Sequence, residues 1–449
     1  MLSTRSRYVL VLLWCLTGGF LGMGLAQSVF ITPKSNSPYS RFGLGDPVDQ
    51  FFVHSAAMGG LSAAFHNPYY LNLQNPASLA RLRATAFETG IFGRYSVLQG
   101  EGQTDNNWGG NLQYMALGFP IQNPINKALD RRLTPFSWGM SFSLVPFTQV
   151  GYSVEVETQG EEGVEGTQNI LKGSGGTYRV VWGNGFRYKN FSAGINLGYY
   201  FGKIKNNRRI EFDSLEVSFD AEFLTELSVG GLVWGVGTQY VHWLDEGESE
   251  NEGKRVTFGA HAGSVSGLNT RSARFFTRDN RGFTILDTIL IEQDIPGEGK
   301  MPLELGVGAI YQELNRFMVG VDLQWSNWSE YRNDAKPEAL MDSWRLSAGT
   351  EFIPDYTSYN NYFERIRYRL GFYYSNDPRN FGGEQLKDYG ISLGMGFPVI
   401  RPRQQISFVN LAVQAGRFGL SGLLRENYVK ISLGFTLNDN TWFFKRKFN

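Results

Sequence analysis

The stretch Phe191-Ser192-Ala193-Gly194-Ile195-Asn196-Leu197-Gly198-Tyr199-Tyr200-Phe201 decides the fold class of this sequence. Its odd positions are apolar, and most of its even positions are small or polar. Because successive side chains of a β-strand point to opposite faces, the alternation predicts a strand with one apolar and one polar face. The run is longer than the ~5–6 residues of an average globular strand and suits a tilted crossing of a bilayer.

The same alternation recurs to the end of the chain. Its polar positions carry glycine and mixed charge, such as Glu88, Arg94 and Asp322, as a crowded lumen requires. An even number of strands returns the last strand to the side where the first began, as in bacterial barrels. The sequence therefore predicts an all-β fold, a transmembrane antiparallel β-barrel over residues 81–437. Its strands are expected near 82–98, 110–120, 136–157, 173–189, 190–204, 225–243, 254–265, 302–312, 316–328, 342–354, 365–375, 386–398, 404–416 and 426–437, which makes fourteen.

The connections between these strands differ in length. Short ones at 189–190, 313–315 and 400–403 are predicted to face the periplasm, and longer ones at 158–172, 205–224, 266–301 and 329–341 the outside. Two strand-like stretches, 210–219 and 283–293, would raise the count to sixteen if they crossed the membrane. Fourteen is preferred because 283–293 alternates poorly and 271–281 is too basic and polar for a tight turn.

The N-terminus predicts export to the bacterial outer membrane. Arg5 and Arg7 precede an apolar run from Tyr8 to Met23, and small residues follow, so residues 1–26 are interpreted as a signal peptide. Cys15, the single cysteine, lies within it, and an exported chain without disulfides must rely on a large hydrogen-bonded framework. Without the signal, 42 basic and 42 acidic residues become 40 and 42, a net charge of −2 that gives no indication of a nucleic-acid partner.

Composition also fits a membrane barrel. Glycine supplies 54 of 449 residues, against a usual share of ~7%, and aromatics reach 15%. Both suit a packed lumen with aromatic girdles. Residues 438–449 form a basic aromatic tail that could extend a girdle, contact the periplasm or serve as an assembly signal.

Two stretches ahead of the first strand resemble a known signature. They are Ala57-Met58-Gly59-Gly60-Leu61-Ser62-Ala63-Ala64-Phe65 and Asn72-Leu73-Gln74-Asn75-Pro76-Ala77-Ser78-Leu79-Ala80. Both are similar to the hatch motif of the FadL-like family of outer-membrane transporters for hydrophobic compounds. A block from Met301-Pro302-Leu303 to Trp325 and Trp328 resembles a further hairpin of that family. Gly-Gly and Asn-Pro also occur in ordinary surface loops, so the order of these motifs carries the argument.

The resemblance implies that residues 27–80, here called the hatch segment, form a plug inside the barrel. The alternative is a periplasmic arm, but Phe42, Phe51 and Tyr70 are more apolar than a disordered tail requires. It further implies a barrel surrounded by outer-membrane lipids that lets hydrophobic, fatty-acid-like molecules pass passively. It implies no cofactor, no metal and no enzymatic activity. The implied ligand path contains Met58, Gly59, Gly60, Asn75, Pro76 and Ala77.

The third expected strand contains Pro146, which has no N–H to donate to a ladder. One interpretation places Pro146 above the membrane, where the strand runs into a loop. The other is an inward kink that opens the wall, as the FadL-like resemblance implies, with Phe147 beside a lateral exit for apolar solute. The second interpretation predicts a bulge or gap at 145–149 that faces the hatch segment.

Two rival functions remain at this stage. Some FadL-like relatives serve type IX protein secretion, so the chain could be a structural or secretion-associated barrel that docks protein partners through its long loops. A general porin is disfavoured by the plug. Catalysis finds no support, because His54, His66, His242 and His261 lie apart without the spacing of paired metal ligands.

Overall fold

Alternating strands can satisfy their backbone hydrogen bonds in a membrane only by closing on themselves, and in the computed structural model they do so. The structure describes residues 37–100, 102–121, 135–158, 166–212, 219–245, 252–280, 283–401, 405–420 and 422–439, which all belong to one compact unit. The predicted signal peptide, most of the tail and the start of the hatch segment lie outside these residues.

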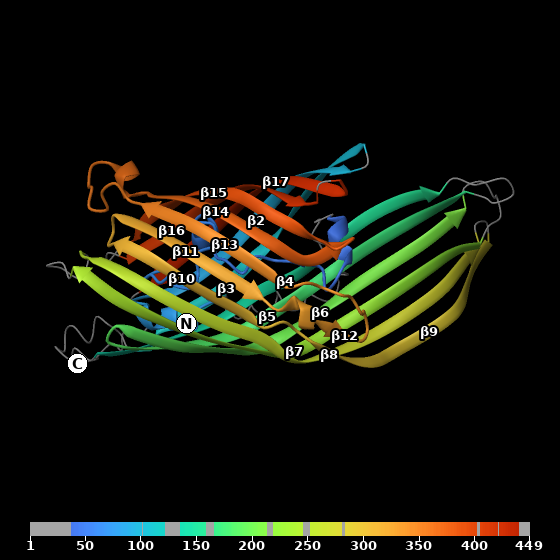
Figure 1. Cartoon of the computed structure of the whole chain (residues 1–449), viewed down its shortest axis with the longest axis horizontal. Helices are drawn as coiled ribbons and strands as arrows, with labels where there is room; N and C mark the ends of the chain where they lie inside the picture. Colours follow the sequence, from blue (N-terminus) through green and yellow to red (C-terminus); the bar gives the residue numbers. More distant parts are fainter. Residues whose placement is uncertain are drawn as a thin grey trace, which may run out of the picture. The chain divides into compact units, whose positions relative to one another are not determined.

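Fourteen antiparallel strands form the closed ring, which confirms the predicted fold and count (Figure 1). The ring closes where β8 pairs with β10 and where β17 pairs with β2. Its members are β2 (Thr85–Gly100), β3 (Gln103–Pro120), β4 (Phe136–Thr158), β5 (Thr167–Tyr188), β6 (Phe191–Phe212), β7 (Phe219–Asp245), β8 (Lys254–Asn280), β10 (Glu304–Glu313), β11 (Phe317–Ser326), β13 (Ser343–Phe352), β14 (Arg367–Phe381), β15 (Glu384–Arg401), β16 (Gln405–Gly419) and β17 (Leu424–Asp439).

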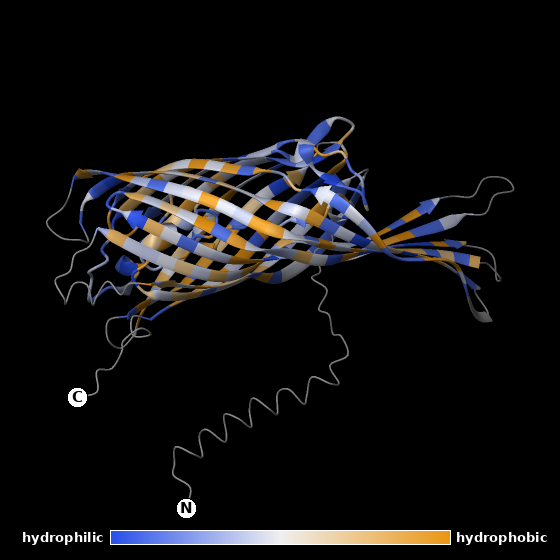
Figure 2. Cartoon of the chain, turned by 90° about the horizontal axis from the view of Figure 1, so that it is seen from below, coloured by the Kyte–Doolittle hydropathy of each residue, from blue (hydrophilic) through white to orange (hydrophobic). Residues whose placement is uncertain are grey.

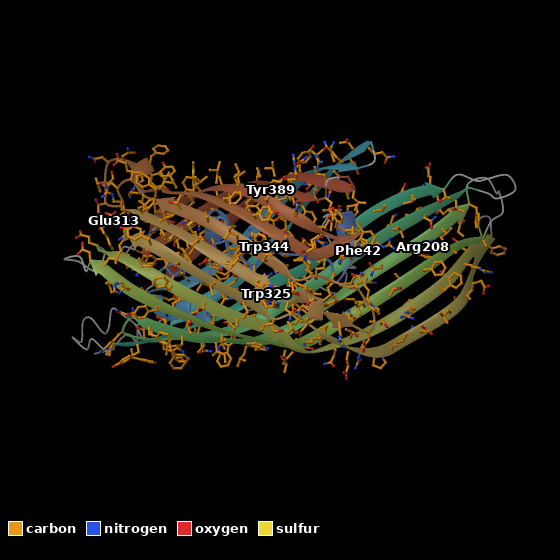
Figure 3. The ribbon with its side chains drawn as sticks, viewed as in Figure 1. Phe42, Arg208, Glu313, Trp325, Trp344 and Tyr389 are labelled. Carbon is orange, nitrogen blue, oxygen red and sulfur yellow. The ribbon has the colours of Figure 1, made fainter. Side chains whose placement is uncertain are left out.

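The alternation of the sequence appears as alternating exposure in the wall. In β11, Val319, Val321 and Leu323 are exposed, whereas Met318 and Asp322 are buried. Trp325, Trp344 and Tyr389 likewise stand on the outer surface of the ring (Figure 3). The outer surface is therefore apolar and the inner surface mixed, as a lipid-facing barrel requires.

Three predicted loops are wrong, because strands continue through them. The stretches 158–172, 205–224 and 266–301 belong largely to β4–β8 and to β9 (Phe283–Lys300). Beyond the ring these strands form a narrow projecting sheet, here called the extension sheet: residues 153–158, 167–172, 205–212, 219–226, 268–280 and 283–300 (Figure 2). The sequence shows strand-like stretches here only at 210–219 and 283–293, so period-two hydrophobicity indicates only part of this sheet.

The extension sheet also explains the uncertain strand count. Phe283–Lys300 is a strand, but β9 pairs with the outer half of β8 and, at its base, with β12 (Arg332–Asn333). It is therefore outside the ring. Smaller boundary errors concern β3, which begins at Gln103 rather than 110, and β17, which reaches Asp439.

Short elements complete the described chain. The hatch segment contains η2 (Pro38–Arg41), β1 (Asp46–Pro47), α2 (Val53–Ala56) and η3 (Pro76–Arg81), and η4 (Trp328–Glu330) and η5 (Tyr362–Arg365) lie in connections. The tight turns at Lys189 and Asn315 use positive φ angles of 53° and 57°. No helix among the described residues is long and apolar enough to cross a membrane.

Candidate functional site

The described part of the hatch segment lies directly on glycines of the inner wall. A Cβ built on Gly349 or Gly371 would strike the backbone at Met58 and Gly59, and one built on Gly237 would strike the side chain of Asn75. A Cβ on Gly194 would lie 2.5 Å from the carbonyl carbon of Pro76. Wall glycines thus let the hatch backbone approach closely, which is one use of the high glycine content.

Buried polar side chains fix the two hatch motifs. The Asn75 amide donates to the carbonyls of Ala63 (2.6 Å) and Thr238 (3.0 Å), while its Oδ1 accepts from the Ala77 N–H at 3.1 Å. From β15, Ser392 accepts from the Gly59 N–H at 2.9 Å. Because unsatisfied buried polar groups are costly, these bonds define one seated position.

Asp322 of β11 holds the middle of the hatch segment. Its Oδ2 accepts from the Ala63 N–H at 2.8 Å, from the Ser62 hydroxyl at 3.1 Å and from the Ser62 N–H. The sequence indicates Asp322 only as a lumenal charge. Its role depends on hydrogen bonds to Ser62, which lies 260 residues away in the chain, and no local sequence pattern predicts such a contact.

The wall is interrupted between β3 and β4. These strands are paired from Pro120↔Gly139 to Met115↔Leu144, whereas the other edge of β3 stays paired with β2 as far as Gln103. Above Leu144, residues 145–152 of β4 are all buried, so both faces of this segment are covered. The segment has therefore left the lipid-exposed surface, and an opening, here called the seam, separates it from β3.

Pro146 and Phe147 lie at the seam. The pairing of β4 with β5 shifts by one residue between Pro146 and Thr148, which leaves Phe147 as the unpaired residue of a bulge. The Phe147 ring is 5% exposed and packs under the Arg179 guanidinium, 3.6 Å from the ring centroid. The side chain thus points into the interior rather than into lipid.

The hatch segment covers the seam from inside. In β1, Asp46 and Pro47 pair with Gln149 and Thr148 of β4. The Val48 N–H donates to the Phe147 carbonyl at 2.9 Å, and the Gln50 amide donates to the Pro146 carbonyl at 2.8 Å.

On the β3 side, the Gln113 amide donates to the Phe51 carbonyl at 3.0 Å. Residues 46–51 therefore bridge the two strands that do not pair with each other, and few hydrogen bonds hold this bridge.

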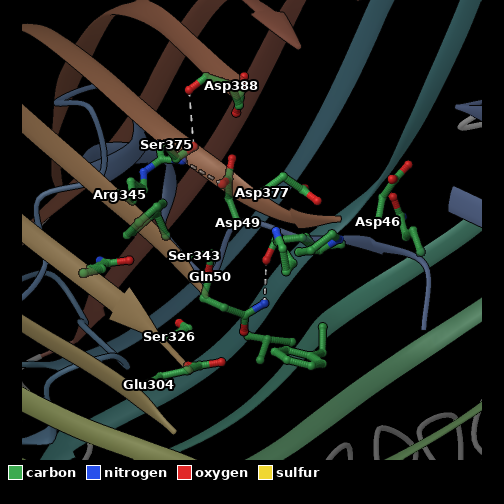
Figure 4. Close-up of a pocket in the computed structure, with 18 of the residues that line it drawn as sticks. Asp46, Asp49, Gln50, Glu304, Ser326, Ser343, Arg345, Ser375, Asp377 and Asp388 are labelled. Atoms are coloured by element: carbon green, nitrogen blue, oxygen red, sulfur yellow. Dashed lines mark hydrogen bonds and ion pairs between the residues drawn. The ribbon is translucent and has the colours of Figure 1, made fainter. Parts of the chain in front are cut away.

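A lumenal cavity of about 350 Å³ opens beside this bridge (Figure 4). Charged groups dominate part of its lining, and the two acidic residues of the hatch segment are among them. Asp49 lies 3.3 Å from the Lys430 ammonium and 3.5 Å from the Arg345 guanidinium, and Asp46 contacts Arg379. Apolar side chains reach the cavity near the seam, namely Phe51, Val145, Phe147 and Val181.

Neighbouring charges set the protonation of Asp49. Burial raises the pKa of the Asp49 carboxyl, but Lys430 and Arg345 outweigh that effect and hold its pKa below the ordinary value. Asp49 is therefore ionised at neutral pH. Three ion pairs then anchor residues 46–51: Asp46 is tied to β14, and Asp49 to β13 and β17.

The predicted site residues fall into two groups. Met58, Gly59, Gly60, Asn75, Pro76 and Ala77 form the seat on the wall, and none of them lines the cavity. Pro146 and Phe147 lie at the seam, and Phe147 also lines the cavity. Sequence reasoning missed Asp46 and Asp49, although they are the only acidic residues of 27–80. Among the described residues, no group of three or more His, Cys, Asp or Glu side chains could hold a metal ion.

The sequence of this chain matches a known protein family. The sequence pattern of the BamG family matches residues 20–449. The chain belongs to the BamG family. A comparison with the curated proteins found no match for this BamG chain.

Solved barrels share the architecture of this BamG chain. The Ralstonia pickettii toluene transporter TbuX has a TM-score of 0.52 at 13% identity, covering 87% of this chain and 99% of its own. The Pseudomonas putida toluene transporter TodX has a TM-score of 0.53 at 16% identity, covering 86% and 97%. A Pseudomonas aeruginosa FadL homologue has a TM-score of 0.53 at 11% identity, covering 88% and 99%. The FadL-like architecture expected from the hatch motifs is thereby confirmed.

Proposed function

We propose that this protein lies in the bacterial outer membrane and lets hydrophobic small molecules pass through the seam, with residues 46–51 as the gate. The observation that carries the proposal is a break in an otherwise closed wall that is covered from inside by the hatch segment. An apolar solute gains by leaving sideways into lipid rather than crossing a polar lumen. The toluene transporters with the same fold support this assignment.

The lining of the cavity limits the class of cargo. Phe51, Val145, Phe147 and Val181 make the lining apolar near the seam, while the ion pairs of Asp49 with Lys430 and Arg345 lie elsewhere in the lining. A solute with an apolar body and a small polar end, such as a fatty acid, would meet both surfaces. Met58, Gly59, Gly60, Asn75, Pro76 and Ala77 then act by fixing the hatch segment, and Pro146 and Phe147 border the exit.

A disulfide across the gate tests this function. Asp46 and Gln149 are register partners, and the described residues contain no cysteine of their own. In proteoliposomes, the oxidised Asp46→Cys/Gln149→Cys variant should pass a fluorescent fatty acid more slowly than the same variant after reduction. Each single-cysteine variant serves as the control and should not respond to reductant. Equal rates before and after reduction would rule out residues 46–51 as the gate.

A second function is favoured by a different observation. The extension sheet projects beyond the ring and contributes nothing to the seam or the cavity (Figure 2). Passage of small molecules does not require it. We propose that it docks a protein partner, as in the secretion-associated interpretation of the sequence.

A further inference from the structure

The outer edge of β9 is an open sheet edge. Pairing with β12 and the Asp334 N–H bond to the Glu298 carbonyl (3.0 Å) cover only the base of β9. In the described part of the chain, no strand pairs with the outer edge of its stretch 287–296, whose other edge pairs with β8. Such an edge presents unpaired N–H and C=O groups, which natural proteins normally cover or disrupt.

This edge is also apolar. Ile289, Leu290 and Ile291 are consecutive, and they are 44%, 43% and 57% exposed. Neighbouring residues of a strand point to opposite faces, so apolar groups are exposed on both faces of the sheet at this edge. Bulges at Ile289 and around Asp294, where φ is 54°, limit the regular stretch to residues 290–292. A partner strand would therefore pair over a short distance.

Charge alternates from strand to strand between β6 and β9 in the extension sheet. The basic end of β6 meets the acidic end of β7, where Glu226 lies 2.7 Å from Lys203 and 2.6 Å from Lys205. The basic end of β8 follows, and Arg274 reaches Glu292 of β9 at 3.9 Å. The acidic residues of β9 are Asp287, Glu292, Asp294 and Glu298. Because opposite charges on neighbouring strands stabilise a sheet, this order calls for a basic strand next to β9.

We propose that the edge of β9 binds an extended basic segment of another protein, with alternating cationic and aliphatic side chains. The segment adds a strand to the sheet through the backbone of residues 290–292 and covers Ile289 and Ile291. Asp287 and Asp294 have no ion pair among the described residues and supply its counter-charges. A second copy of this chain does not fit, because β9 and the opposite edge, with Glu155 and Glu157, are both acidic. The inference rests on the docking function proposed above.

A synthetic peptide tests the recognition chemistry. The probe is a capped, fluorescently labelled octapeptide of alternating lysine and valine, titrated against the full chain in neutral detergent by fluorescence anisotropy. The Asp287→Lys/Glu292→Gln variant should bind it about tenfold more weakly, because it removes two acidic groups from the edge and adds a basic one. The control, Glu157→Lys/Glu155→Gln, makes the same change of charge on the opposite edge and should bind like wild type. Equal loss in both variants would overturn the assignment to β9.

Photo-crosslinking in cells separates this inference from docking in general. A photoreactive residue is placed at Ile291 on the edge or at Phe219, which is 57% exposed on β7 inside the same sheet. A protein adduct from Ile291 and none from Phe219 is the expected result. An adduct from Phe219 alone would overturn the assignment of binding to the β9 edge but would keep docking through the face of the sheet. No adduct from either position would remove both proposals.

Discussion

At the residue scale, glycine determines how closely the hatch segment approaches the wall. Gly237 and Gly235 lie two residues apart on β7 and face the same side, but they have different neighbours. A Cβ at Gly237 would strike Asn75, whereas the nearest atom to a Cβ at Gly235 is 3.5 Å away, the Cβ of Asn196. Between these two positions, contact with the hatch segment therefore decides which one requires glycine.

Gly237→Ala should unseat the hatch segment without opening the barrel. The added methyl displaces the Asn75 amide from its carbonyl partners, and overpacking of this kind costs ~1–3 kcal/mol. We expect faster proteolysis within residues 37–80 and faster dye passage, with heat-modifiable migration unchanged. Gly235→Ala is the matched control and should behave as wild type. Equal proteolysis of the two variants would contradict the seating by glycine.

The Asp49 ion pairs should make the gate sensitive to acid. Because the pKa of Asp49 is lowered in the folded state, its contribution to stability is complete above the ordinary carboxyl pKa of about 3.9 and is lost as pH falls below it. Passage of a hydrophobic dye through proteoliposomes should therefore rise below about pH 4. Asp49→Asn should pass dye faster at neutral pH and show a smaller acid response than wild type, because Asp46 still titrates in the variant. An unchanged pH profile in the variant would show that the ion pairs do not hold the gate.

At the scale of elements, the two halves of β4 lie in different surroundings. Its first half pairs with β3 and exposes Phe142 to lipid, and its buried segment 145–152 lies inside. Pro146 lies where they join, which is where a residue without an N–H interrupts a ladder least.

Pro146→Val should narrow the seam. Valine restores an N–H and favours extended backbone, so the regular pairing of β4 can continue further. We expect slower uptake of a fatty acid, with the barrel still heat-modifiable. Pro398→Val is the control, because Pro398 of β15 lies opposite Phe408 in an unbroken ladder and should not affect uptake. Unchanged uptake in Pro146→Val would remove the proline from the exit mechanism.

At the scale of the whole molecule, the ring and the extension sheet are separable. β8 pairs with β10 over Lys254–Gly263, and this contact closes the ring without β9. The extension begins further along β8, where Leu268 pairs with Gly299 and Asn269 with Glu298.

Replacing residues 270–297 by Asn-Gly tests this separation. Asn269 and Glu298 are already register partners, so a two-residue turn can join them. The shortened chain should form a heat-modifiable barrel with unchanged dye passage, and it should lose binding of the lysine–valine peptide. A chain that no longer forms a barrel would show that the extension sheet is needed for folding.

The sequence by itself determined the ring. Period-two hydrophobicity, as in Phe191–Phe201, fixes which face of each strand meets lipid, and the physical cause is local to the strand. The hatch motifs could be found for a similar reason, since Gly59 adopts a φ of 72° that favours glycine and Asn75 caps a turn beside Pro76.

Only the tertiary structure decided the extension sheet, the covering of the seam and the ion pairs of the gate. Ion pairs between neighbouring strands hold the ends of β6–β9, and the sequence of one strand alone does not show which strand will be its neighbour. Asp46 and Arg379 are separated by 333 residues in the chain, and Asp49 and Lys430 by 381. Such pairs form because closure of the ring brings distant strands around one hatch segment, and that closure is a property of the whole barrel.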